Sequence, residues 1–150
     1  MMKSKQQQFA LRIALFILRQ NGYTQPPKKQ VLNFLQMRRL LQFPDTELQR
    51  RRASDHDEIW QNDISWKRKD LFMDGEVGSP EHGHWCLTQA GIDKVERQKA
   101  NWLKLESEAE IETVLSQFEY WTEELINWML KIAKGESLSL KLDPRRAYSH

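Results

Sequence analysis

Residues 57–91, DEIWQNDISWKRKDLFMDGEVGSPEHGHWCLTQAG, decide the fold that this sequence predicts. On a helix of 3.6 residues per turn, the first half of the stretch forms one broad apolar face. That face holds Ile59, Trp60, Ile64, Trp66 and Leu71, and both tryptophans are expected in the core. Turn-forming glycine and proline residues follow at 75–83, and an alternating run at 84–87 predicts a strand. The stretch therefore predicts a helix, a two-stranded hairpin and the start of a further helix.

Two helices are predicted before this stretch. Apolar residues from Phe9 to Leu18 recur at helical spacing and predict a largely buried first helix, which ends at Asn21 and Gly22. A second helix is predicted from about Pro27 to Leu41. Three helices followed by a hairpin are the order of a winged helix-turn-helix. We therefore predict a mainly helical α+β fold with a winged-helix domain over residues 8–100.

A second apolar pattern lies in the C-terminal part of the chain. Its residues follow each other in alternating steps of three and four and predict one long amphipathic helix of about 25 residues, which Gly135 ends. They are Ile111, Val114, Phe118, Trp121, Leu125, Trp128 and Ile132. Soluble monomers rarely expose such a stripe. Segment 101–135 therefore either folds back onto the first helix or pairs with a second copy, and we favour the homodimer. Residues 136–150 are predicted to be a flexible tail.

Composition and charge limit the class of protein. No apolar run approaches the roughly 20 residues that span a membrane, so no membrane association is predicted. The single cysteine, Cys86, excludes an intrachain disulfide and fits a reducing cytoplasm. Residues 1–105 carry 18 Lys and Arg against 12 Asp and Glu, a net charge of +6, whereas residues 106–150 carry 5 against 9, a net of −4. The basic first part favours a polyanionic partner, although ordinary solvated surfaces explain the charges as well.

The third predicted helix carries polar side chains of the types that bind base edges in the major groove of double-stranded DNA. These candidates are Gln61, Asn62, Ser65 and Arg68. Further residues are expected at phosphates, where contacts set register and make affinity depend on salt. They are Lys28, Lys29, Arg50, Arg51, Arg52 and Lys69, together with Ser79 and His82 in the wing. The alternative is a solvated face, as in winged helices that bind proteins.

No set of residues with a catalytic spacing is found. The sequence contains no Ser-His-Asp set, phosphate-binding glycine loop or dinucleotide motif. His82, His84 and Cys86 alternate along one side of the hairpin, but even with His56 they lack the paired spacing of structural zinc sites. We therefore predict that the chain is not an enzyme and holds no cofactor and no metal.

The hairpin contains the pattern G-x-W-x-L-T-x-x-G from Gly83 to Gly91. It follows a helix and helix exit marked by Trp60, Asn62, Asp63, Ile64, Trp66, Leu71, Gly75, Glu76 and Val77. From about Phe9 to Arg97, the chain resembles the N-terminal winged-helix domain of Mrr-type restriction endonucleases. The resemblance implies a DNA-binding module that positions a nuclease, often one concerned with modified foreign DNA.

One feature of that family is missing from the sequence. Mrr-type enzymes carry a much larger nuclease domain of the PD-(D/E)xK class after this module, and the residues after the resemblance show no such motif. We therefore expect a separate recognition module without the cleaving domain. Two other functions stay open, a dimeric winged-helix transcriptional regulator and a winged-helix module that binds another protein.

Overall fold

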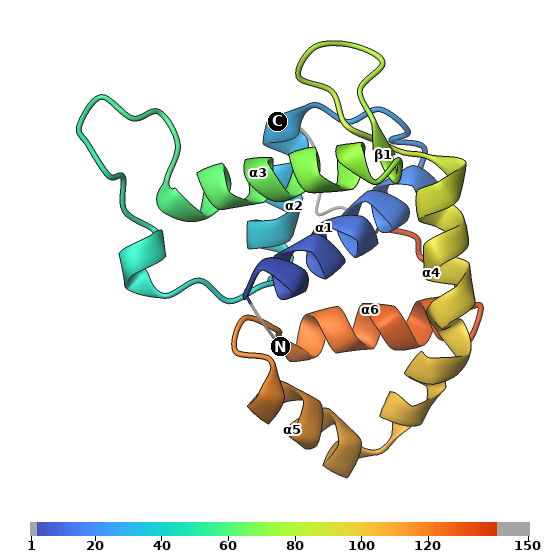
Figure 1. Ribbon diagram of the computed structural model, residues 1–150. Coiled ribbons are helices and arrows are strands. Elements are labelled where there is room, and N and C mark those ends of the chain that lie inside the picture. The colour runs from blue at the N-terminus through green and yellow to red at the C-terminus, as the bar shows by residue number, and fades with distance from the viewer. Residues whose placement is uncertain (1–2, 141–150) are drawn as a thin grey trace.

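The computed structural model describes residues 3–140, and its first helix, α1 (Lys3–Gln20), runs through the middle of the molecule (Figure 1). The other helices are α2 (Lys28–Met37), α3 (Ile59–Met73), α4 (Gln89–Trp102), α5 (Glu108–Gln117) and α6 (Glu123–Ala133). Two 3₁₀ helices are η1 (Asp45–Glu47) and η2 (Leu103–Glu106), and the strands are β1 (Val77–Gly78) and β2 (Cys86–Leu87). The prediction of a mainly helical fold with a small hairpin is confirmed.

Helix α1 is the centre of the hydrophobic core. Every residue from 10 to 18 is buried, as expected for a helix that is apolar on all sides. Helices α2, α3 and α4 pack directly on it, and in Figure 1 α3 lies above α1 and α6 below it. The helix begins at Lys3, and Gln6 and Gln7 are buried. The first helix is therefore longer than predicted, and residues 3–7 belong to the folded part of the chain.

Helix α2 is shorter than predicted. It ends at Met37, and Arg39 adopts a left-handed conformation with φ of 55°. Leu40 and Leu41 are buried, so they reach the core from the segment after the helix. Both residues were predicted to lie in the helix, and the structure places them after it.

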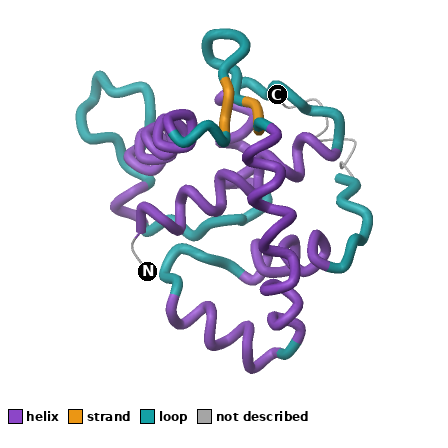
Figure 2. Tube along the Cα trace, turned by 45° about the vertical axis from the view of Figure 1, so that its right-hand side comes forward, coloured by secondary structure: helices purple, strands orange, loops and turns teal. Residues whose placement is uncertain are grey.

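The hairpin is anchored to the start of α2. Strands β1 and β2 pair in antiparallel register, and Pro27 forms an isolated antiparallel bridge with His84. The Lys28 amide donates to the Gly83 carbonyl at 2.9 Å, and the Trp85 amide donates to the Pro26 carbonyl at 2.9 Å. The segment between α1 and α2 thus pairs with the hairpin beside its two strands. Figure 2 shows the two strands beside the helices.

The single long C-terminal helix that we predicted is wrong. The chain leaves helical geometry at Phe118 and starts α6 after Thr122, whose side chain accepts a hydrogen bond from the Leu125 amide at 3.1 Å. Between the two helices, the Gln42 amide donates to the Tyr120 carbonyl at 2.7 Å. Pairing with the segment after α2 therefore interrupts the helix.

The apolar stripe is covered by the same chain, so the argument that favoured a homodimer fails. Trp121, Leu125, Trp128 and Ile132 are buried in the core, while Ile111, Val114 and Phe118 are partly buried against it. The ring of Phe9 in α1 lies 5.0 Å from that of Trp121, centroid to centroid. Closure of the chain on itself, the alternative to pairing with a second copy, is what the structure has.

The segment after α6 also packs against the core. Gly135 has φ of 70° and ends the helix as predicted. The Asn21 side chain then holds the next residues, donating to the Leu138 carbonyl at 2.9 Å and accepting from the Leu140 amide at 2.9 Å. This part of the tail predicted over 136–150 is fastened to α1, and residues 141–150 lie outside the described residues. Within residues 3–140, no helix is both long and apolar enough to cross a membrane.

Candidate nucleic-acid interface

Helix α3 has an inner face and an outer face. Trp60, Ile64 and Leu71 are fully buried on the inner face. Four residues spaced by three or four positions lie opposite to them and form what we call the outer ridge, namely Asn62, Trp66, Lys69 and Met73. Met73 is 75% exposed and Trp66 is 55% exposed. Two of the four, Asn62 and Lys69, were predicted as DNA contacts.

Trp66 corrects the predicted core. It was assigned to the apolar face with Trp60, but it lies on the outer ridge with its indole beneath the Lys69 ammonium, which is 5.2 Å from the ring centroid. Trp66 lies four residues after Asn62 and seven residues before Met73, and these spacings place the three side chains on the same side of a helix. The apolar character of the side chain outweighed its position on the helix in the sequence prediction.

Two predicted base-reading residues are engaged within the helix itself. The Gln61 side chain accepts from the Glu58 amide at 2.9 Å, completing a capping box at the start of α3. The Ser65 hydroxyl donates to the Gln61 carbonyl at 3.0 Å. Both residues lie beside the outer ridge and have local structural roles.

Arg68 joins α3 to the hairpin. Its guanidinium carbon lies 5.9 Å from the Trp85 ring centroid and 5.8 Å from that of Phe72. Among the described residues, its buried Nε has no hydrogen-bond partner. Contact with two aromatic rings limits the rotational freedom of the guanidinium. Arg68 therefore presents a fixed positive charge at the edge of the outer ridge.

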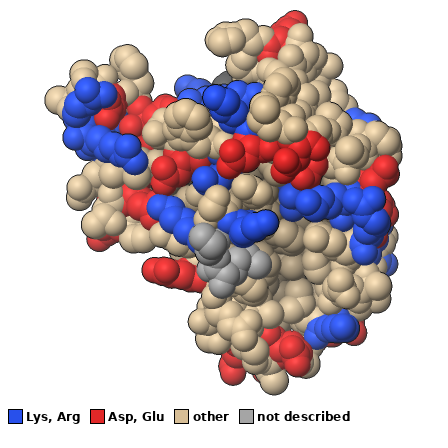
Figure 3. Space-filling model, in the orientation of Figure 1, with Lys and Arg blue, Asp and Glu red and all other residues tan. Residues whose placement is uncertain are grey.

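Two projections rise on the same side of α3. One is the loop of residues 48–58, at the N-terminal end of the helix, and the other is the hairpin turn of residues 79–85 (Figures 1 and 2). Figure 3 shows Lys and Arg side chains gathered on the loop and a notch between the two projections. The outer ridge lies between a basic loop and a hairpin turn.

The cations predicted at phosphates differ in their freedom. Arg50 and Arg51 are exposed and form no ion pair with any described residue, whereas Arg52 lies 3.4 Å from Asp55. The Lys28 ammonium is 2.7 Å from the Asp57 carboxylate, which links the start of α2 to the basic loop. Its neighbour Lys29 is exposed. Among the described residues, the unpaired charge is thus concentrated at Arg50, Arg51, Lys29 and Lys69.

The hairpin turn is shaped by its own hydrogen bonds. The Ser79 hydroxyl, predicted to contact DNA, lies 3.2 Å from the Glu81 carbonyl and 3.1 Å from the His84 carbonyl, within donating distance of both. Gly83 has φ of 80°, a conformation that favours glycine. His82 is exposed at the tip, beside the exposed carboxylate of Glu81. The turn is therefore weakly charged compared with the basic loop.

The G-x-W-x-L-T-x-x-G pattern is explained by folding. Trp85 and Leu87 are buried on one side of the hairpin. The Thr88 side chain accepts from the Gly91 amide at 3.3 Å and caps α4. A Cβ atom on Gly91 would lie 2.5 Å from the Glu76 carbonyl oxygen and 2.6 Å from Leu87 Cδ1. The pattern holds the hairpin against α4.

A buried ion pair fixes the exit of α3. The Arg12 Nε lies 2.6 Å from the Glu76 carboxylate, and the Lys94 ammonium approaches the same carboxylate at 3.4 Å. Arg12 and Glu76 are both nearly inaccessible to solvent. Because a buried charge without a partner is costly, this contact sets how α3 and the hairpin lie on α1 and α4.

A second polar cluster fixes the start of α3. The Lys3 ammonium lies 2.7 Å from Glu47 and 3.1 Å from Asp63, and the Tyr120 hydroxyl donates to Glu47 at 2.8 Å. Burial lowers the pKa of Lys3, but hydrogen bonds to Glu47 and Asp63 and their charges outweigh it and raise the pKa to about 12. Burial and the Glu47 hydrogen bond raise the pKa of Tyr120. The cluster connects α1, η1, α3 and the α5–α6 connection.

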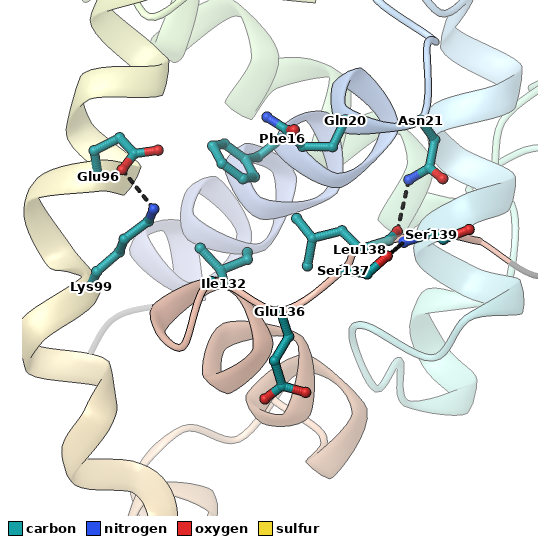
Figure 4. Close-up of a pocket in the computed structure, with 11 residues that line it drawn as sticks. Phe16, Gln20, Asn21, Glu96, Lys99, Ile132, Glu136, Ser137, Leu138 and Ser139 are labelled. Carbon is teal, nitrogen blue, oxygen red and sulfur yellow. Dashed lines mark hydrogen bonds and ion pairs between the residues drawn. The ribbon is translucent and has the colours of Figure 1, made fainter.

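A pocket of about 480 Å³ lies away from the outer ridge, between the end of α1, α4 and the segment after α6 (Figure 4). Two of its charged groups are paired, since the Lys99 ammonium lies 2.7 Å from the Glu96 carboxylate, and a third, Glu136, is exposed. On its other side Asn21 holds Leu138. Across residues 3–140, no three His, Cys, Asp or Glu side chains lie close enough to hold a metal ion.

Comparison with known protein families gives a match to the first part of the chain. The family model described as Mrr N-terminal domain matches residues 10–97. This range runs from α1 through most of α4 and contains the outer ridge and the hairpin. No curated protein and no solved structure matches the chain significantly.

Proposed function

The chain belongs to the Mrr N-terminal domain family, and from this premise we propose that it binds double-stranded DNA through a winged helix. In this proposal α3 enters the major groove and the hairpin is the wing. The observation that carries it is the exposed outer ridge, which stands between two projections on one side of the molecule. A helix presented in this way fits the width of the major groove.

The order of elements supports the winged-helix assignment. Three helices precede the hairpin, and Pro27 adds a bridge to His84 where a winged helix has its first strand. The buried contacts of Arg12, Glu76 and Trp85 keep the hairpin in one position relative to α3. A fixed relation between helix and wing is needed for both to touch one duplex.

Each predicted DNA contact then has a role. Asn62 on the outer ridge pairs with an adenine edge, and Lys69 with a nearby phosphate. Arg50, Arg51 and Lys29 bind phosphates through charges that no described carboxylate neutralises. Arg68, held by Trp85 and Phe72, presents its guanidinium to guanine or phosphate. Gln61, Ser65, Lys28, Arg52, Ser79 and His82 stay at the margin of the interface.

We also propose that the chain recognises DNA without cutting it. The matched family region is the N-terminal domain, and the remaining described helices α5 and α6 complete its core. Phosphodiester cleavage by the PD-(D/E)xK class needs carboxylates on strands that hold metal ions. The carboxylates of Glu108, Glu110 and Glu112 lie instead on or beside α5, on an exposed surface.

Fluorescence anisotropy with a labelled duplex at 50 and 200 mM salt tests the proposal. We expect binding that weakens steeply with salt, and a double variant Arg50→Ala/Arg51→Ala should lower the slope of log K against log salt by about 0.9 for each lost phosphate contact. Lys104→Ala, an exposed lysine on η2, is the matched control and should leave the slope unchanged. Absence of salt-dependent binding would exclude the DNA function.

A protein-binding module is the second candidate, because the outer ridge carries exposed Trp66 and Met73. Aromatic and methionine side chains are enriched in protein interfaces. The same titration separates the two functions, since a ridge that binds only protein gives no salt-dependent affinity for a duplex. A dimeric transcriptional regulator is less well supported, because Trp121, Leu125, Trp128 and Ile132 of its predicted dimer interface are buried within the chain and the rest of that interface is partly buried.

A further inference from the structure

We propose that Trp66 is a specificity-determining residue that selects thymine, by packing against the C5 methyl group exposed in the major groove. The inference rests on the proposed binding of DNA by α3. It starts from the exposed indole, which no sequence expectation assigned to the interface. Trp66 is 55% exposed although Trp60, on the same helix, is fully buried.

The position of Trp66 makes it a groove-facing group. It lies between Asn62 and Lys69 on the outer ridge, so a duplex that meets those two polar side chains also meets the indole. The Lys69 ammonium over one face of the ring limits the orientations of both side chains. An exposed tryptophan held in this way presents a defined apolar surface.

Among the base edges of the major groove, that of thymine suits the apolar surface of the indole. In the major groove guanine, adenine and cytosine present hydrogen-bond donors and acceptors, and only thymine adds a methyl group. An indole placed against a polar edge leaves donors or acceptors unpaired. Against thymine, it removes a methyl group from water, which contributes about a fourfold gain in affinity.

The spacing on α3 joins Trp66 to Asn62. A rise of about 1.5 Å per residue places Cα atoms four residues apart about 6 Å from each other along the helix axis, close to two base-pair steps. Asn62 can pair with adenine while Trp66 meets a thymine methyl nearby. The ridge therefore favours sites rich in A·T pairs.

The test compares alternating poly(dA-dT) with alternating poly(dA-dU), which differ in the thymine methyl group. For the unchanged full chain, we expect binding to the uracil polymer to be about fourfold weaker. Trp66→Ala should bind both polymers equally, and Trp66→Leu, which keeps an apolar side chain, should retain part of the preference. Met37→Ala, at an exposed methionine outside the ridge, is the control and should keep the full ratio.

The outcomes separate this inference from the proposed function. Salt-dependent binding with equal affinity for the two polymers overturns the role of Trp66 and leaves DNA binding in place. A preference for thymine that survives in Trp66→Ala also overturns it. If neither polymer binds, both statements are wrong, and an apolar partner protein becomes the better occupant of the ridge. Circular dichroism of each variant confirms that its helices are intact.

Discussion

Trp60 and Trp66 lie six residues apart on α3 and have opposite environments. Trp60 is fully buried, its ring 4.3 Å from that of Phe43, while Trp66 is 55% exposed under Lys69. Their chemistry is identical, so the difference comes from the side of the helix on which each lies. Residues on the inner face therefore hold the fold, and those on the outer ridge are available for recognition.

The largest expected effect tests the two tryptophans directly. Trp60→Ala should lower the free energy of unfolding by about 3–5 kcal/mol, because it leaves a large cavity in the core. Trp66→Ala should change it by no more than about 0.5 kcal/mol, because the side chain is exposed. Urea unfolding followed by circular dichroism measures both values. Similar losses in the two variants would contradict the division of α3 into two faces.

The division into buried and exposed faces also applies to the C-terminal helices, where Leu125 of α6 is fully buried. Leu125→Ala should lower the free energy of unfolding by about 2–5 kcal/mol. Because the stripe is covered within the chain, the unfolding midpoint should not depend on protein concentration. A midpoint that rises with concentration would show that part of the stripe is covered by a second copy.

A smaller loss is expected at the close contact behind the hairpin. In Gly91→Ala the new methyl group meets the Glu76 carbonyl oxygen at 2.5 Å, so the backbone must shift, at a cost of about 1–3 kcal/mol. The neighbouring Ala90 is exposed, and Ala90→Ser should change stability by less than about 0.5 kcal/mol. Thermal unfolding of the two variants compares them. Equal stability would show that the backbone around Gly91 accommodates the methyl group without loss of packing.

The smallest effect is expected at the Lys3 cluster and appears only in alkali. Lys3 has a pKa raised from 10.5 to about 12, so the folded state holds this proton more tightly than the unfolded state. Its stabilisation is fully present below pH 10.5 and is lost as pH rises through about 12. Because its side chain is 39% exposed, solvent limits the contribution to less than about 1 kcal/mol.

The variant Lys3→Met measures this contribution, with Lys5→Met at a neighbouring exposed lysine as control. The stability difference between Lys3→Met and the unchanged chain should be largest near pH 9 and shrink as pH approaches 12. Urea unfolding at several pH values follows the difference. A difference that stays constant across this range would show that Lys3 acts through packing and not through its charge.

Much of the fold could be predicted from local signals. Gly22 and Gly135 end helices at the expected positions, Thr88 starts α4, and the hairpin strands alternate as expected. The break before α6 also had a local signal that we did not use. Thr122 followed by Glu123 and Glu124 has the side chains favoured at a helix start.

The site was harder to predict than the fold. Lys69, Arg50 and Arg51 are exposed and Asn62 is half-buried, whereas Trp66, which was assigned to the core, is exposed. Gln61 and Ser65 were chosen for their polar side chains and their place opposite the apolar face, but their side chains form hydrogen bonds at the start of α3 and within it. The sequence does not determine which hydrogen-bond partner a polar side chain has in the folded protein.

The sequence by itself determined the presence of the first four helices, the hairpin and the family, because caps, turn residues and apolar periodicity act over a few neighbouring positions. Only the tertiary structure decided where the C-terminal stripe is buried and which side of α3 is free. Those outcomes depend on contacts between distant segments, such as the Gln42 amide with the Tyr120 carbonyl and Arg12 with Glu76. Burial is decided by what packs against a residue, and one helix pattern is compatible with several such neighbours.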